Sequence, residues 1–183
     1  MLDQNILNLH HDLLERCRSG DQDAHYRIYK LYSRSMYNVA CRITGREDEA
    51  EDVLQESFIN AFRNLDNYRG DATFGSWLKR IVVNNSINAL KKRRHELLPE
   101  DEDFDVAEEL EGEEVYKTEL TVDKVKRAIE SLPDGYRSVL SLYLLEGYDH
   151  QEIAEILSIT ESTSKSQLNR SKKKLKELLT GML

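Results

Sequence analysis

The sequence predicts an all-α protein in which two helical domains are joined by a flexible acidic linker. Three observations support this prediction. Apolar residues recur at the spacing of amphipathic helices over most of the chain. The 183 residues include only 2 Pro and 8 Gly, too few breaks for many short strands. One acidic segment, 97–119, interrupts the helical pattern, so we expect domains at 1–96 and 120–183.

Four helices are expected in the first domain. Residues 3–18 and about 22–44 carry apolar side chains at helical spacing. The apolar stripe of the third helix consists of Ala50, Val53, Leu54, Ser57, Phe58, Ala61, Phe62 and Leu65. Thr73 can cap the fourth helix. The stripe of that helix consists of Phe74, Trp77, Leu78, Ile81 and Val82.

The charge of the chain is unevenly distributed. The net charge is −8, and residues 97–123 alone hold 1 basic and 12 acidic side chains. Residues 1–96 hold 15 and 14, and residues 124–183 hold 10 and 8, so both flanking parts are nearly neutral. The segment 97–119 has few apolar residues, so burial cannot offset the entropy lost on ordering it. We therefore expect a linker there. Its acids lack the spacing of a calcium-binding loop.

The second domain is expected to end in a helix, a short break and another helix. Its helices are predicted at about 121–131, 135–145, 149–157 and 161–179. Asp149 can cap the third of these helices, and Glu152 completes an Asp variant of the capping box. Ser158-Ile159-Thr160 breaks the pattern, and Thr160 can cap the last helix. This order is typical of a helix-turn-helix that places its second helix in the major groove of DNA.

The last helix has the composition of a DNA-binding helix. From Ser162 to Lys176 it holds six Lys or Arg residues and no acid. Short polar side chains in its first turns suit base edges, and cations suit phosphates. The candidate contacts are Ser162, Thr163, Lys165, Ser166, Gln167, Asn169, Arg170 and Lys173. The alternative is a charged amphipathic helix that only packs against its neighbours.

A second basic helix, from Trp77 to Arg94, also contains no acid. Its polar residues recur on one ridge opposite the apolar stripe, and the loop before it can stack on or hydrogen-bond an unpaired base. The candidate contacts are Asn64, Tyr68, Arg69, Trp77, Arg80, Asn84, Asn88, Lys91, Arg93 and Arg94. The pattern fits equally well a solvated face whose final cations interact favourably with the helix dipole.

The carboxylates at 47–56 lie at the start of the third helix, where the helix dipole stabilises acids. No His, Cys or Lys accompanies them, which favours a solvated face or a protein-docking surface over catalysis. We find no P-loop, nucleophile elbow or Gly-rich dinucleotide turn, and predict no enzyme, catalytic residue, metal or cofactor.

The remaining features indicate a cytoplasmic protein. Cys17 and Cys41 lie in apolar helical patterns, so we expect reduced core thiols rather than a redox pair. No apolar run has the length of a membrane span, and the N-terminus is not a signal peptide. We therefore expect no direct membrane insertion.

Two blocks of the sequence resemble the extracytoplasmic-function (ECF) sigma factors of bacterial RNA polymerase. The first runs from EAEDVLQESFINAFRNLDNYRG to TFGSWLKRIVVNNSINALKKRR and is similar to sigma region 2. The second, LPDGYRSVLSLYLLEGYDHQEIAEILSITESTSKSQLNRSKKKLKELL, is similar to region 4. The resemblance covers about residues 8–95 and 120–180, and the co-occurrence of both blocks is highly specific.

The resemblance implies a role for each domain. Residues 1–96 would be region 2, which docks on the β′ coiled coil of core polymerase and opens the −10 element. The implied docking residues are Asp48, Glu51, Asp52, Gln55, Glu56 and Phe58. Residues 120–183 would be region 4, which reads the −35 element and contacts the β flap. The candidate contacts of the two basic helices would then bind −10 and −35 DNA. An anti-sigma factor is a further implied partner.

Three residues depart from the family pattern. Ser158 stands where the family usually has Gly, Ser164 where it has an aliphatic core residue, and Gln167 where it often has Arg. The base preference of the last helix is therefore not predicted. The alternative function is a stand-alone helix-turn-helix transcriptional regulator controlled by its N-terminal domain.

Overall fold

The computed structural model describes residues 2–97 and 121–181, and describes side chains for residues 10–93 and 121–181. All helices and turns of these residues agree with the all-α prediction, which is confirmed for the described chain. The expected linker lies outside the described residues from position 98 onward. The described residues fall into two compact units, one within Met1–Cys41 and Arg46–Ser86 and the other within Arg42–Gly45 and Ile87–Leu183.

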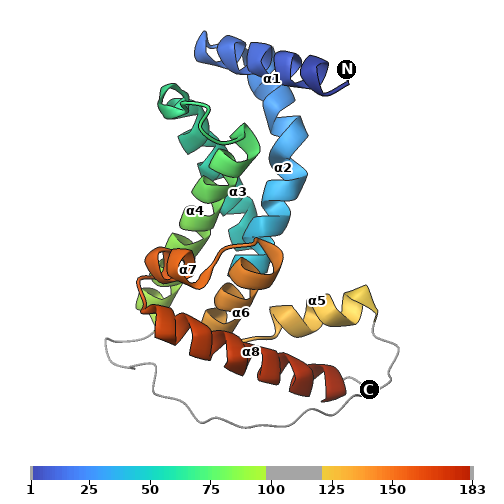
Figure 1. The fold of residues 1–183 in the computed structure, drawn as a ribbon, viewed down its shortest axis with the longest axis vertical. Helices are drawn as coiled ribbons and strands as arrows, with labels where there is room; N and C mark the ends of the chain where they lie inside the picture. The colour runs from blue at the N-terminus through green and yellow to red at the C-terminus, as the bar shows by residue number, and fades with distance from the viewer. Residues whose placement is uncertain (1, 98–120, 182–183) are drawn as a thin grey trace. The chain divides into compact units, whose positions relative to one another are not determined.

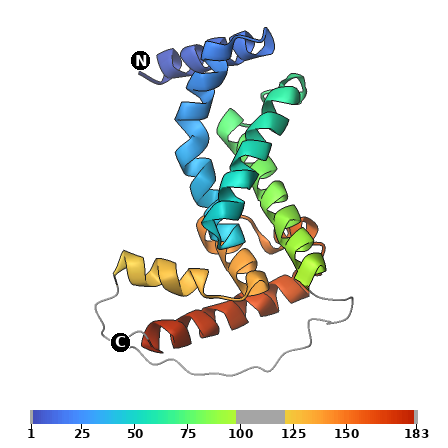
Figure 2. The same cartoon turned by 180° about the vertical axis from the view of Figure 1, so that it is seen from behind.

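The first unit is built from four helices and a short 3-10 turn (Figure 1). The elements are α1 (Leu2–Arg18), α2 (Gln22–Thr44), α3 (Glu47–Arg63), η1 (Leu65–Asn67) and α4 (Phe74–Leu97), of which α2 and α4 each have their last turns in the second unit. Both views show α2, α3 and α4 side by side, with α1 across one end (Figures 1 and 2).

The core of the first unit forms because each helix contributes one apolar stripe. All of the expected stripe of α3 is buried except Phe62, which is half-buried. In α4, Phe74, Leu78 and Val82 are buried, whereas Trp77 is half-buried. The hydroxyl of Tyr32 lies 2.7 Å from Nε2 of His10 inside an aromatic cluster that includes Phe74. Burial lowers the pKa of His10 from its ordinary value.

The second unit is completed by five elements. They are α5 (Val122–Glu130), α6 (Asp134–Leu140), η2 (a π-helix, Ser141–Leu145), α7 (His150–Leu157) and α8 (Glu161–Gly181). The long α8 packs against α5, α6 and α7. The apolar core includes Leu132, Val139, Leu140, Leu142, Ile153 and Leu168. The expected helix 135–145 therefore exists, but its second half is a π-helix, a form common at functional sites.

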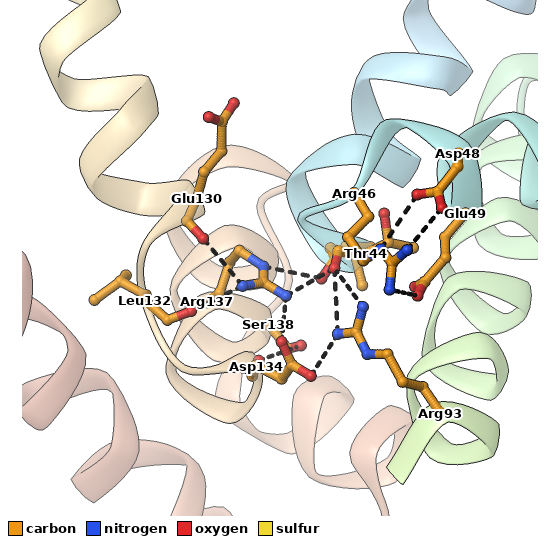
Figure 3. A network of polar contacts seen from close by, with 11 residues as sticks. Thr44, Arg46, Asp48, Glu49, Arg93, Glu130, Leu132, Asp134, Arg137 and Ser138 are labelled. Carbon is orange, nitrogen blue, oxygen red and sulfur yellow. Dashed lines mark hydrogen bonds and ion pairs between the residues drawn. The ribbon is translucent and has the colours of Figure 1, made fainter. Parts of the chain in front are cut away.

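A buried guanidinium organises part of the second unit (Figure 3). Arg137 on α6 is 4% exposed. It donates hydrogen bonds to the carbonyls of Ile43 (3.2 Å), Thr44 (2.8 Å), Glu130 (3.3 Å) and Leu132 (2.8 Å) and to the carboxylate of Asp134 (2.5 Å). The last carbonyls of a helix lack partners within it, so Arg137 supplies donors to the end of α2.

Gly45 makes room for this guanidinium. A Cβ atom at position 45 would clash with the guanidinium of Arg137, and the φ angle of +70° also disfavours other residues. A second ion pair nearby joins Arg42 to Glu146, whose side chain is 4% exposed. None of these contacts follows from the local sequence pattern.

Candidate nucleic-acid interface

The break between α7 and α8 is held by side-chain caps. The Asp149 carboxylate accepts from the Glu152 amide (2.8 Å), and the Glu152 carboxylate accepts from the Asp149 amide (2.9 Å). Thr160 Oγ1 accepts from the amide of Thr163 (3.0 Å). Both predicted caps are therefore confirmed. Because each cap satisfies amides that the helix leaves unpaired, the two helix ends are fixed locally.

The residue that turns the chain between the two helices is Ser158. It adopts the left-handed conformation, with φ 59° and ψ 44°. The amide of Ile159 donates to the carbonyl of Ala154 (3.0 Å), which closes α7 in the manner of a Schellman motif. Glycine adopts this conformation without a steric cost because it has no Cβ atom. A serine at this position is therefore strained.

One face of α8 is exposed and basic. Ser162, Lys165, Asn169 and Lys173 are exposed, whereas Thr163, Ser166 and Arg170 are half-buried. Lys165 forms an exposed ion pair with Glu161 at 2.6 Å. A pair of this kind contributes little, so Lys165 can exchange it for a phosphate.

Gln167 is on the opposite face of α8, and its predicted DNA contact is not compatible with this structure. Its side chain is only 4% exposed. The buried positions of α8 are Ser164, Gln167, Leu168 and Ser171, which recur at helical spacing on one face. Gln167 therefore belongs to the side that packs inward, because it lies one turn from Ser164 and next to Leu168.

The polar ridge expected on α4 is exposed. Arg80, Asn84, Asn88 and Lys91 are all exposed along this helix. Arg93 differs, because its side chain is 16% exposed and pairs with Asp134. It also donates to the carbonyl of Thr44 at 3.4 Å. Arg94 lies within α4, but its side chain is outside the described set.

The loop before α4 holds the remaining candidates of the first basic site. Arg69 and Asn64 are exposed, and the side-chain Nδ2 of Asn64 donates to the carbonyl of Asn60 (2.8 Å). Tyr68 packs against Trp77, with ring centroids 5.4 Å apart, and donates to the carbonyl of Ala72 (2.7 Å). Burial raises the pKa of Tyr68. The two aromatic rings are thus half-buried and ordered by their neighbours.

Arg18 is a functional candidate that the sequence analysis missed. Its guanidinium donates to the carbonyl of Tyr68 (3.0 Å) and ties the loop to the end of α1. Nothing in the local pattern indicates this contact, because the two residues are 50 positions apart.

The acidic helix α3 presents the expected surface with one correction. Asp48, Glu51, Asp52, Gln55 and Glu56 are exposed. Arg46 pairs with Asp48 at 2.7 Å, and this hydrogen bond lowers the pKa of the Asp48 carboxyl.

Phe58 was predicted within that surface, but it is 4% exposed. Its ring packs against Tyr29, with centroids 4.9 Å apart, and against Phe62 at 5.8 Å. The next residue, Ile59, is 49% exposed and supplies the apolar part of the acidic face instead.

Two features are absent from the described part of the chain. Among those residues, no three His, Cys, Asp or Glu side chains are arranged to hold a metal ion. None of the described helices is both long and apolar enough to span a membrane.

Comparisons with known proteins identify the family of the chain. Residues 28–96 match the family model for Sigma-70 region 2, and residues 123–175 match that for Sigma-70 region 4. The ECF RNA polymerase sigma-E factor of Salmonella typhimurium is 34% identical over 170 residues, which cover 87% of this chain and 88% of that protein. The RNA polymerase sigma-H factor of Pseudomonas aeruginosa is 30% identical over 181 residues, covering 93% and 94%. The ECF sigma factor SigE of Mycolicibacterium smegmatis is 32% identical, and the match spans 60% of its length.

Two solved structures share the fold. One is a co-crystal structure of the sigma factor RpoE with the anti-sigma factor NepR from Bartonella quintana, with a TM-score of 0.57 and 23% identity, covering 85% of this chain and 96% of that one. The other is CnrH in complex with the cytosolic domain of CnrY, with a TM-score of 0.53 and 24% identity, covering 92% and 96%.

Two helical regions with these family signatures, in this order, define an RNA polymerase sigma factor of the sigma-70 type. The relatives that match over most of their length narrow the class, and the chain belongs to the ECF sigma factors. The resemblance stated from the sequence is therefore confirmed.

Proposed function

We propose that this chain directs core RNA polymerase to promoters through three separate helix faces. The observation that supports the proposal is that each face carries the charge its partner requires. The exposed face of α3 is acidic, whereas those of α4 and α8 are basic. The protein would act by positioning polymerase and holding opened DNA, with no covalent chemistry of its own, and would work in the cytoplasm.

Core polymerase would dock on α3. Asp52, Gln55, Glu56 and Ile59 lie on one exposed side of this helix, where acidic and amide groups surround one apolar residue. An apolar centre with a charged rim is typical of protein interfaces. Phe58 would support this surface from beneath, because its ring is buried against α2 and the next turn of α3. Region 4 would add a contact to the polymerase β flap.

The −10 element would be opened and held by α4 and the loop before it. The exposed ridge of α4 offers cations and amides for phosphates and bases. Trp77 and Tyr68 are half-buried, so each exposes part of a ring on which an unpaired base can stack. Arg18 would keep the loop in place through its bond to the Tyr68 carbonyl.

The −35 element would be read by the first turns of α8. Ser162 and Lys165 are exposed there, and Thr163 and Ser166 are half-exposed. Lys173 and Arg170 would contact phosphates further along the helix. Because phosphate contacts carry no sequence information, base preference would rest on the first turns alone.

An anti-sigma factor is a further proposed partner. Both structures that share the fold are complexes with a second protein, and in one of them a sigma factor is bound to the anti-sigma factor NepR. The idea would be abandoned if no protein co-purified with this chain from its native cells and the isolated chain were active without treatment.

Binding to purified bacterial core polymerase tests the proposal, measured by fluorescence anisotropy of the labelled chain. Asp52→Lys reverses one charge at the centre of the acidic face and is expected to weaken binding at least tenfold. Glu130→Lys is the matched control, since it makes the same charge change at an exposed site on α5. It should bind like the unmodified chain.

The rival function, a stand-alone helix-turn-helix regulator, predicts a different result. Such a protein would not bind core polymerase, yet it would bind duplex DNA with the salt dependence of phosphate contacts. Equal loss of core binding in both variants would argue against α3 as the docking surface.

A further inference from the structure

A polar contact joins the first residue of α7 to the buried side of α8. Nδ1 of His150 lies 2.9 Å from Oγ of Ser164, within hydrogen-bond distance. Ser164 is fully buried, with 0% of its surface exposed. A buried hydroxyl must find a partner, and His150 is the one the structure provides. Ser164 is also one of the residues that depart from the family pattern, because sigma factors usually have an aliphatic residue at this position.

The imidazole of His150 also contacts an aromatic ring from η2. The ring of Tyr143 stacks on it, with centroids 4.6 Å apart and planes 22° apart. Tyr143 comes from η2, where the wider π-turn closes with a hydrogen bond from the Glu146 amide to the Ser141 carbonyl (3.0 Å). The neighbouring cap at Asp149 fixes the backbone of His150. Three elements of the second unit thus meet at one histidine.

We propose that His150 is a positioning residue that sets the rotation of the DNA-reading helix through Ser164. This inference rests on the proposed −35 function of α8. Ser164 is the fourth residue of α8, in the same turn as Ser162, Thr163 and Lys165. Rotation of that turn decides which of these side chains face the groove, because neighbouring helix residues point about 100° apart.

The chemistry explains why a histidine is suited to this task. A serine leaves less side-chain volume at the interface than the aliphatic residue it replaces, and it adds a hydroxyl that apolar neighbours could not satisfy. An imidazole supplies a flat, partly apolar body together with a ring nitrogen that can pair with the hydroxyl. His150 and Ser164 therefore act as a pair that takes the place of an apolar contact.

The test compares holoenzyme binding to two duplexes. Core polymerase is reconstituted with the full chain, and a duplex is selected from a random −35 library by the unmodified holoenzyme. A second duplex carries a scrambled −35 segment and is otherwise identical. His150→Ala should lower the preference for the selected duplex about five- to tenfold, the effect of one lost hydrogen bond.

Two further variants separate positioning from general damage. His150→Asn keeps an amide near the position of Nδ1 and should recover most of the preference. Gln151→Ala, at the exposed next residue, should leave it unchanged. If the two groups act as one pair, the double variant His150→Ala with Ser164→Ala should show a −35 preference no lower than that of the more impaired single variant.

Several outcomes would overturn the inference. One is an unchanged preference in His150→Ala; another is a His150→Asn variant as impaired as the alanine. A third is equal weakening of both duplexes, which would indicate damage to α8 as a whole. If the unmodified holoenzyme itself shows no −35 preference, the proposed function of α8 fails first and the inference fails with it.

Discussion

Replacement of Arg137 by methionine should destabilise the second unit by about 3 kcal/mol. The side chain keeps a similar length but loses every donor, while its acceptors remain. The carbonyls of Ile43, Glu130 and Leu132 each lose the hydrogen bond from Arg137. The carbonyl of Thr44 retains a donor in Arg93, so it contributes less.

The magnitude follows from the number of acceptors left without this donor. The carbonyls of Ile43 and Leu132 are buried and that of Glu130 is part-buried. Each costs about 1 kcal/mol when it loses this partner, and the three together give about 3 kcal/mol. This value agrees with the roughly 3–5 kcal/mol lost when one partner of a buried ionic contact is removed. The carboxylate of Asp134 adds little, since it is 48% exposed and also pairs with Arg93.

Hydrogen exchange of peptides from α6 measures this loss within the second unit. Amides that open only on unfolding should exchange more than a hundredfold faster in Arg137→Met, the equivalent of about 3 kcal/mol. The control is Arg127→Met, which removes an exposed arginine from α5. An acceleration below about tenfold would refute the reasoning, because the carbonyls would then be satisfied without Arg137.

Two other predictions concern single residues. Ser158→Gly relieves the left-handed conformation between α7 and α8, and should raise the free energy of unfolding by about 0.5–1 kcal/mol in urea titrations; a loss of stability would show that the serine side chain is needed there. Burial raises the pKa of the Cys17 thiol from 9.0 to about 11. The unfolded thiol therefore ionises first, and its contribution to stability, complete below about pH 9, is lost as the pH rises toward 11. The fall in unfolding free energy between pH 8 and pH 10 should be about 1 kcal/mol smaller in Cys17→Ala than in the unmodified chain; equal falls would contradict the assigned pKa.

The sequence predicts the helices and the caps because both depend on residues close together in the chain. Asp149 and Glu152 are three positions apart, as are Thr160 and Thr163, so the hydrogen bonds follow once a helix begins there. The short polar residues between α7 and α8 mark the break for the same reason. The predicted bounds of the second helix, about 22–44, agree with α2 on similar grounds.

Site residues are harder to predict than helices, because the sequence must show which side of a helix is buried and which is exposed. Phe58 belongs to the apolar stripe of α3, and that periodicity places it inside; the family resemblance alone placed it on the docking surface. Gln167 has no apolar character, so periodicity could not reveal that it faces inward. Arg93 resembles its exposed neighbour Lys91 in sequence, but a tertiary contact with Asp134 draws it in.

Arg137 illustrates a contact that no local reasoning could supply. The two α2 carbonyls that it binds are 93 and 94 positions away along the chain. The sequence contains hints, since Gly45 follows the end of a helix and can adopt a positive φ angle. A glycine at that point predicts a helix end, but it does not show that a guanidinium will fill the space beside it.

The inner face of α8 explains why polar contacts matter so much in the second unit. Of its four buried residues, Ser164, Gln167, Leu168 and Ser171, only Leu168 is apolar. Apolar burial is non-directional and tolerates small rotations of a helix, whereas hydrogen bonds do not. The angle at which α8 presents its basic face is therefore determined more by pairs such as His150 and Ser164 than by packing volume. Substitutions at these inner polar positions should alter which DNA sequence is preferred before they unfold the helix, and this separates them from changes at Leu168, which should reduce stability first.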